Sequence, residues 1–137
     1  MLQELLVIDD ADLHLSILRK IATQEGFNTT GARSVAEATQ ALRAQTFDCI
    51  TLDLSLGDQS GIDILKLLAD IKCRTPVIII SASDDGVREE MNRIGNFLDL
   101  NICPTIPKPI NIAVLRKALK QIAEDTQRQK LKAPAGW

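Results

Sequence analysis

Short apolar runs recur along the chain, and they predict the strands of a sheet. Residues 49–52 are nearly all apolar, and 77–80 form the most hydrophobic and β-branched run in the sequence. Such short runs, bounded by turn-forming residues, are typical of strands buried on both faces of a parallel sheet. A third apolar run at 5–8 and the segments 27–32 and 101–106 predict the other three strands. The segment 27–32 is more polar, as expected of a strand at a sheet edge.

Between these runs, apolar positions recur at helical spacing, which predicts amphipathic helices. The positions that form the patterns are His14, Ile17, Leu18 and Ile21; Val35, Ala38, Ala41 and Leu42; Ile64, Leu65, Leu68 and Ile71; and Val114, Leu115, Leu119 and Ile122, with a further helix over 87–98. Gly26 is expected to end the first helix. Strands that alternate with helices predict an α/β fold with a parallel sheet covered on both faces.

Polar residues at the expected helix starts support these assignments. Ser34 is a good N-cap, and Glu37 three residues later completes a capping box. Asp84 or Asp85 is expected to cap the fourth helix, and Asn111 the last one. The local signals and the apolar pattern therefore agree on where three of the helices begin.

The length and the net charge of the chain limit the classes of protein to which it can belong. A chain of 137 residues is long enough for one domain with its own core, which we place at 1–125. The polar, basic segment that follows predicts a helix end and a loose tail over 126–137. A formal net charge of −2 argues against direct binding of nucleic acid.

The lengths of the apolar runs and the spacing of the cysteines predict the cellular compartment. No run reaches the roughly 18 apolar residues that cross a bilayer, and the first residues do not form a signal peptide. Cys49, Cys73 and Cys103 are far apart and form no metal-type pair, so we expect reduced thiols. We therefore expect a cytoplasmic protein without membrane contact.

Charged and hydroxyl side chains stand where the strands end. They are Asp9 and Asp10 after the first strand, Asp53 after the third, Ser81 after the fourth and Lys108 after the fifth. The carboxyl ends of parallel strands meet at one edge of a sheet, so these side chains are expected to lie together. Two carboxylates about 4 Å apart repel by about 4 kcal/mol at an effective dielectric near 20, and Mg²⁺ removes that cost. With a lysine and a hydroxyl added, the site suits transfer of a phosphoryl group onto a carboxylate.

Together these motifs resemble the receiver domain of two-component response regulators, over nearly the whole chain. They are Val-Ile-Asp-Asp at 7–10, Leu-Asp-Leu at 52–54 followed by Gly61, Ser-Ala at 81–82 and Lys-Pro at 108–109. The resemblance implies a flavodoxin-like, doubly wound sheet of five parallel strands in the order 2-1-3-4-5, with helices on both faces. It also implies a phosphoprotein that acts in signal transduction.

The resemblance further implies how Mg²⁺ would be held. Asp10 and Asp53 would ligate the ion directly together with the backbone carbonyl of Ser55, and Asp9 would act through water. A helix cap without a metal role is the simpler alternative for Asp10.

The same resemblance implies that Asp53 is the phosphoacceptor for a sensor histidine kinase or a phosphotransfer protein. Lys108 would pair with the phosphoryl oxygens, Ser81 would turn its hydroxyl onto them, and the Lys108–Pro109 bond would be cis. Such a domain relays a signal by a conformational change and is not an enzyme, beyond slow self-dephosphorylation at most. The simpler alternatives are a strand-end hydroxyl for Ser81 and a solvated charge for Lys108.

Three other interpretations fit the sequence less well. His14 could be a phosphodonor, but it lies on an apolar helical stripe, so we expect a partly buried structural histidine. A phosphorylation-independent interaction module would keep the fold alone, and the complete set of acidic residues and lysine argues against it. A haloacid-dehalogenase-like phosphatase needs a second Asp two residues after the nucleophile, where this chain has Ser55.

The chain departs from the family in how a signal would leave the site. Thr105 stands where receivers often carry Tyr or Phe, and the segment between Ser81 and Lys108 is longer than usual. We therefore expect 87–103 to carry the change, with the fourth helix, fifth strand and last helix contacting an unknown output partner or forming a homodimer. The end of that segment, 98–109, resembles receivers that precede EAL-type domains.

Overall fold

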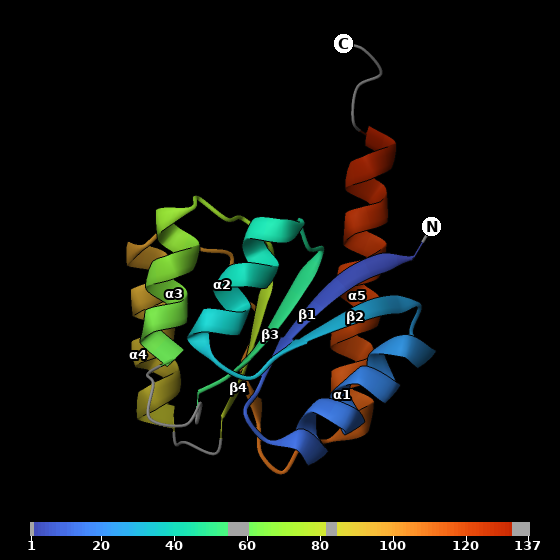
Figure 1. Cartoon of the computed structure of the whole chain (residues 1–137), viewed down its shortest axis with the longest axis horizontal. Helices are drawn as coiled ribbons and strands as arrows, with labels where there is room; N and C mark the ends of the chain where they lie inside the picture. The colour runs from blue at the N-terminus through green and yellow to red at the C-terminus, as the bar shows by residue number, and fades with distance from the viewer. Residues whose placement is uncertain (1, 55–60, 82–84, 133–137) are drawn as a thin grey trace.

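The computed structural model describes residues 2–54, 61–81 and 85–132, and it alternates strands with helices throughout (Figure 1). The strands are β1 (Gln3–Ile8), β2 (Phe27–Ala32), β3 (Cys49–Asp53), β4 (Val77–Ser81) and β5 (Ile106–Pro107), and the helices are α1 (Asp12–Gln24), α2 (Val35–Ala44), α3 (Gly61–Asp70), α4 (Asp85–Phe97) and α5 (Ile112–Lys132). This alternation is the α/β pattern that the sequence predicted.

The strands form one parallel sheet in the order β2-β1-β3-β4-β5. The flavodoxin-like, doubly wound topology expected from the sequence is therefore confirmed. Ile8 lies opposite Leu52 and Ser81 opposite Pro107, so the neighbouring strands end at almost the same level. That alignment brings the residues that follow the strands to one edge of the sheet.

Two apolar cores lie on the two faces of the sheet. Successive side chains of a strand point to opposite faces, so Leu5 and Val7 enter one core and Leu6 and Ile8 the other. The first core is closed by α1 and α5, and the second by α2 and α3 with partly buried residues of α4. Figure 1 shows α1 and α5 on one side of the sheet and the other three helices on the opposite side.

Two of the predicted helix caps are present. The Ser34 hydroxyl accepts a hydrogen bond from the Glu37 amide at 3.1 Å, and the Asn111 side chain accepts one from the amide of Ala113 at 3.0 Å. The Glu37 carboxylate accepts from the amide of Arg33, one residue before the cap, so the second half of the capping box is displaced by one residue. Of the two expected caps of α4, Asp84 lies outside the described residues and Asp85 begins the helix.

The prediction of a fifth strand over 101–106 was too long. Only Ile106–Pro107 pairs with β4, and Ile102 makes a single isolated bridge to Val77. Pro104 lies between these two points of contact and has no amide hydrogen to donate to a ladder. The chain therefore approaches β4 twice without forming a continuous strand.

Three of the predicted apolar helix positions are exposed. Ile17 and Val114 are 39% and 47% exposed, and Ile71, 47% exposed, lies beyond the end of α3. The face that α5 buries is narrower than its apolar stripe, because Leu115, Leu119 and Ile122 are buried but Val114 is not. Helical periodicity identified these helices correctly but overestimated the width of the buried face.

The last helix is longer than its apolar pattern. It continues through Lys132, so the predicted boundary at residue 125 falls inside α5, and 133–137 lie outside the described residues. The division into a domain and a tail stays a prediction. In the described part of the chain, no helix is both long enough and apolar enough to cross a membrane.

The packing of α4 depends on Gly95, which is buried against Ile102. A Cβ atom at position 95 would overlap the Cγ1 atom of Ile102, a β-branched side chain that has little freedom to move aside. Overpacking costs about 1–3 kcal/mol, whereas alanine gains about 1 kcal/mol over glycine as a helix former.

We therefore expect Gly95→Ala to lower the free energy of unfolding by roughly 1 kcal/mol, measured by urea denaturation. Asn92→Ala on the exposed side of the same helix is the control, and it should be neutral or slightly stabilising. A Gly95→Ala variant as stable as the original chain would show that α4 is not held against Ile102 as described.

Candidate functional site

The side chains that the sequence singled out are held at the carboxyl edge of the sheet by backbone hydrogen bonds. The ladder continues past the strand ends: the amide of Asp9 donates to Ala32 at 2.9 Å, and the amide of Lys108 donates to the carbonyl of Ser81 at 3.0 Å. Asp53 is the last residue of β3, between the two. Residues about fifty positions apart are thereby fixed beside one another.

Asp53 and Lys108 form a buried ion pair. The Lys108 Nζ atom lies 2.7 Å from Asp53 Oδ2, and the two side chains are 17% and 2% exposed, respectively. A charge-assisted hydrogen bond at this distance is among the stronger polar contacts in proteins. Because both groups are largely removed from water, loss of the lysine would leave a buried carboxylate without its cation.

Asp9 is the second buried carboxylate, and its two oxygens differ. Its side chain is 1% exposed; Oδ1 accepts a hydrogen bond from the amide of Ala11 at 2.9 Å, while Oδ2 is buried and has no hydrogen-bond partner. Burial raises the pKa of Asp9, and the negative charge of Asp53 adds to that rise. The Ala11 amide opposes the rise in this pKa, as do the nearby His14 and Lys108.

His14 is the residue that the sequence analysis did not assign to the site. Its Nδ1 atom is buried without a hydrogen-bond partner and lies 3.4 Å from Asp9 Oδ2 and 3.9 Å from Asp53 Oδ2. The three side chains offer ligand atoms that all lie within 4.8 Å of one another, an arrangement that could hold a metal ion. The available signal was position: His14 lies in the first turn of a helix that begins directly after β1.

The other predicted site residues lie in different environments. Asp10 is exposed and is outside the group formed by Asp9, His14 and Asp53. Ser81 is buried at the end of β4, beside Lys108, and Ser55 lies outside the described residues. The direct metal role expected for Asp10 stays a prediction, since here it is Asp9 that faces Asp53.

Two features of the segment after β4 bear on the expected switch. The Lys108–Pro109 peptide bond is cis, as the resemblance implied. Thr105, at the position where receivers often carry an aromatic residue, is half-buried, and its Oγ1 atom is buried without a hydrogen-bond partner. A small side chain therefore occupies the position from which a ring would report phosphorylation.

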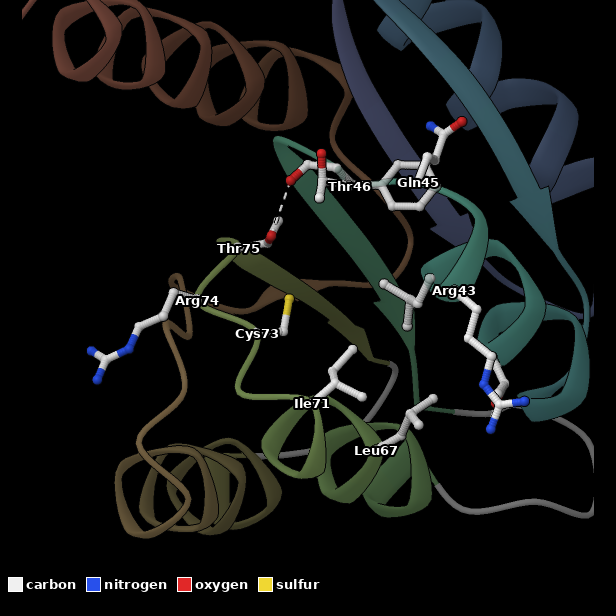
Figure 2. A pocket seen from close by; sticks show the side chains of 11 residues that line it. Arg43, Gln45, Thr46, Leu67, Ile71, Cys73, Arg74 and Thr75 are labelled. Carbon is white, nitrogen blue, oxygen red and sulfur yellow. Dashed lines mark hydrogen bonds between the residues drawn. The ribbon is translucent and has the colours of Figure 1, made fainter. Parts of the chain in front are cut away.

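A cavity of about 390 Å³ opens at the opposite edge of the sheet, between α2 and α3 (Figure 2). Apolar side chains, among them Leu67 and Ile71, and the sulfur of Cys73 line it, and the hydroxyl of Thr75 donates to the carbonyl of Phe47 at 3.0 Å beside it. Its described lining contains no carboxylate. The chemistry expected from the sequence therefore belongs to the carboxyl edge and not to this cavity.

The fold and the edge cluster define a class of protein, and the family comparison agrees with them. Residues 5–120 match the response regulator receiver domain. This match covers most of the chain, so the protein belongs to the receiver domain family of two-component response regulators.

Individual relatives and solved structures are consistent with that assignment. The transcriptional regulatory protein SrrA of Staphylococcus aureus is 30% identical over an alignment of 130 residues, which covers 92% of this chain and 51% of SrrA. The receiver domain of the Francisella response regulator 1452 superposes with a TM-score of 0.78 at 25% identity, covering 90% of this chain and 98% of that one. A Burkholderia pseudomallei response regulator, solved with a phosphorylated aspartic acid, calcium and citrate, has a TM-score of 0.73 at 23% identity, covering 96% and 75%. The chain thus spans about half of the length of the curated relatives it matches.

The raised pKa of Asp9 leads to a testable prediction about the stability of the folded chain. Because its pKa in the folded chain lies above the ordinary value of 3.8, the ionised carboxylate costs stability at neutral pH, and that cost disappears as the pH falls below 3.8. In the presence of a chelator, Asp9→Asn should therefore raise the free energy of unfolding at pH 7 by about 1–3 kcal/mol. The gain should shrink in acid.

Urea denaturation across this pH range measures the effect. Asp10→Asn is the matched control, because that neighbouring carboxylate is exposed and should change stability by no more than about 0.5 kcal/mol. An Asp9→Asn variant that is less stable than the original chain at pH 7 would contradict the assignment.

Proposed function

We propose that Asp53 accepts a phosphoryl group from the phosphohistidine of a sensor histidine kinase or phosphotransfer protein. The observation that carries the proposal is the buried Asp53 carboxylate joined to Lys108 at 2.7 Å, at the sheet edge that also holds Asp9. A carboxylate in this position has a fixed cation beside it and a second acidic group within reach. These are the parts that phosphoryl transfer onto a carboxylate requires.

The chain's own residues have separate roles in the step. A carboxylate oxygen of Asp53 forms the bond to phosphorus as the bond from phosphorus to the donor imidazole nitrogen breaks, and that nitrogen keeps the electron pair. Lys108 offsets negative charge on the phosphoryl oxygens, and the Ser81 hydroxyl donates to one of them. The hydrogen bond from the Lys108 amide to the Ser81 carbonyl holds these two residues beside each other at the end of β4.

The residues present fit a Mg²⁺ site. The buried, unpartnered Oδ2 atom of Asp9 is an orphaned oxygen that faces Asp53, and carboxylate oxygens are the ligands that Mg²⁺ prefers. Asp9, Asp10, Asp53 and the carbonyl of Ser55 would hold the ion, which neutralises charge on the phosphoryl group when bound. The division of these roles expected from the sequence, with Asp10 direct and Asp9 through water, is part of the proposal.

The domain acts as a phosphoacceptor and not as a catalyst of turnover, apart from slow hydrolysis of its own aspartyl phosphate. A phosphorylation-independent interaction module remains the alternative, and it requires none of the buried charges. Retention of Asp9, Asp53 and Lys108 in a costly buried arrangement favours the phosphorylated function.

The proposed partners follow from the family to which the chain belongs. We propose that an output partner, or a second copy of the chain in a homodimer, binds α4, β5 and α5 in the cytoplasm. SrrA is a transcriptional regulatory protein, and the match covers 51% of its length. The resemblance of 98–109 to receivers before EAL-type domains stays a prediction.

Incubation with acetyl phosphate tests the phosphoacceptor. In the presence of Mg²⁺ the intact chain should gain the mass of one phosphoryl group, and Asp53→Asn should gain none because its amide is not a nucleophile. Asp70→Asn, which changes an exposed carboxylate on α3, should label fully. Labelling of Asp53→Asn to the same extent would overturn the assignment.

The route by which the signal leaves the site is tested by hydrogen exchange. Phosphorylation can shift a conformational equilibrium only through contacts that differ between the two states. Since Thr105 cannot supply the motion of a ring, beryllofluoride with Mg²⁺ should change amide protection within 87–103 by roughly tenfold or more, about 1.4 kcal/mol. Residues of α2 serve as the internal control and should not change. Changes confined to the surroundings of Asp53 would exclude this route.

A further inference from the structure

The side chains that could hold a metal ion at the carboxyl edge, Asp9, His14 and Asp53, offer a nitrogen atom as well as oxygens. Asp9 is 99% buried, and its unpartnered Oδ2 atom points toward His14 and Asp53. The Nδ1 atom of His14 is also buried without a hydrogen-bond partner. Buried polar atoms without partners are rare in folded proteins, and a bound ion or water is a common reason for them. Two such atoms facing each other indicate that a third species belongs between them.

The separations suit ligands of a single ion. Metal–nitrogen and metal–oxygen bonds of about 2.1 Å allow two ligands of one ion to lie at most about 4.2 Å apart. His14 Nδ1 lies 3.4 Å from Asp9 Oδ2 and 3.9 Å from Asp53 Oδ2, so both pairs are within that limit. A separation of 3.4 Å is long for a direct hydrogen bond, whose usual range ends near 3.2 Å. A simple His14–Asp9 pair therefore leaves both atoms poorly satisfied.

We propose that His14 Nδ1 is a ligand of the cation site, and that it shifts the preference of the site from Mg²⁺ toward divalent transition-metal ions such as Ni²⁺. Imidazole suits Ni²⁺, whereas Mg²⁺ prefers oxygen ligands and keeps its water. The inference rests on the proposed cation site but adds to it a residue and a selectivity that oxygen ligands alone do not supply.

The surroundings of the imidazole are consistent with this role. The side chain of His14 is 36% exposed while its Nδ1 atom is buried, so the imidazole lies between the cluster and solvent. Lys108 contacts Asp53 on Oδ2 and does not approach Asp9 Oδ2 within hydrogen-bond distance. The Asp9 and His14 atoms are thus available to one ion while the Lys108 pair is kept.

Nitrogen ligation can be detected directly, because His14 is the only histidine in the chain. Mn²⁺ is added to the 137-residue chain without a histidine tag, and pulsed EPR is used to measure coupling to ¹⁴N. A coupling typical of a directly bound imidazole is expected in the original chain. It should be absent from His14→Asn, in which an amide oxygen replaces Nδ1 at nearly the same place, and from His14→Leu, which removes the ligand.

Selectivity is measured by competition on the same samples. Mg²⁺ and Ni²⁺ each displace Mn²⁺, and the ratio of their affinities is compared between variants. We expect His14→Asn to reduce the Ni²⁺ preference by about tenfold or more, since even outer-shell partners of metal ligands change affinity by about 10–100-fold. The Ni²⁺ titration is repeated with Cys73 and Cys103 changed to serine, because these half-buried thiols could also bind a soft cation.

The outcomes separate this inference from the proposed function. Mn²⁺ binding without nitrogen coupling, or an unchanged Ni²⁺ preference in both His14 variants, would overturn the role of His14 while leaving Mg²⁺-dependent labelling of Asp53 intact. Failure of Mg²⁺ both to displace Mn²⁺ and to support labelling by acetyl phosphate would overturn the cation site itself, and the inference with it. If a His14 variant does not fold, the ¹⁴N coupling measured on the original chain still tests whether His14 binds Mn²⁺.

Discussion

The contact between Lys108 and Asp53 is the interaction on which the arrangement of the site depends. At an effective dielectric near 20, opposite charges this close attract by several kcal/mol, which offsets the cost of removing both from water. The pair forms only because β3, β4 and β5 end at the same level of one parallel sheet, where the amide of Lys108 donates to the carbonyl of Ser81. The fold therefore supplies the geometry, and the ion pair makes the buried carboxylate tolerable.

The carboxylate of Asp9, the second at the same edge, is destabilised in its ionised form. Burial raises the pKa of Asp9, and Asp53 raises it further, so this edge is stabilised by anything positive that binds there. A cation or a rearranged lysine changes the energy of the same few atoms. Binding at the edge can thus be linked to a shift in the surrounding elements, because a ligand that interacts differently with two states changes their populations.

The fold of this chain was largely predictable from local pattern. Apolar runs and helical spacing identified the alternating elements, Ser34 and Asn111 capped the helices where expected, and the order of the strands followed from the family resemblance. The pattern overestimated the length of the fifth strand and the width of the buried helix faces. The fifth strand is only Ile106–Pro107, and Ile17 lies at the surface, because strand pairing and the width of a buried face depend on neighbours far away in sequence.

For the site, the sequence by itself determined that Asp9, Asp53 and Lys108 share one edge, since the carboxyl ends of parallel strands lie at the same edge of a sheet. Only the tertiary structure decided which way the side chains near that edge point. Asp9 is buried against Asp53 while its neighbour Asp10 is exposed, and His14 turns a ring nitrogen toward the carboxylates. Two adjacent residues after a strand face different directions because successive side chains of an extended chain alternate, and the pairing of the Asp9 amide with the Ala32 carbonyl continues the ladder as far as Asp9.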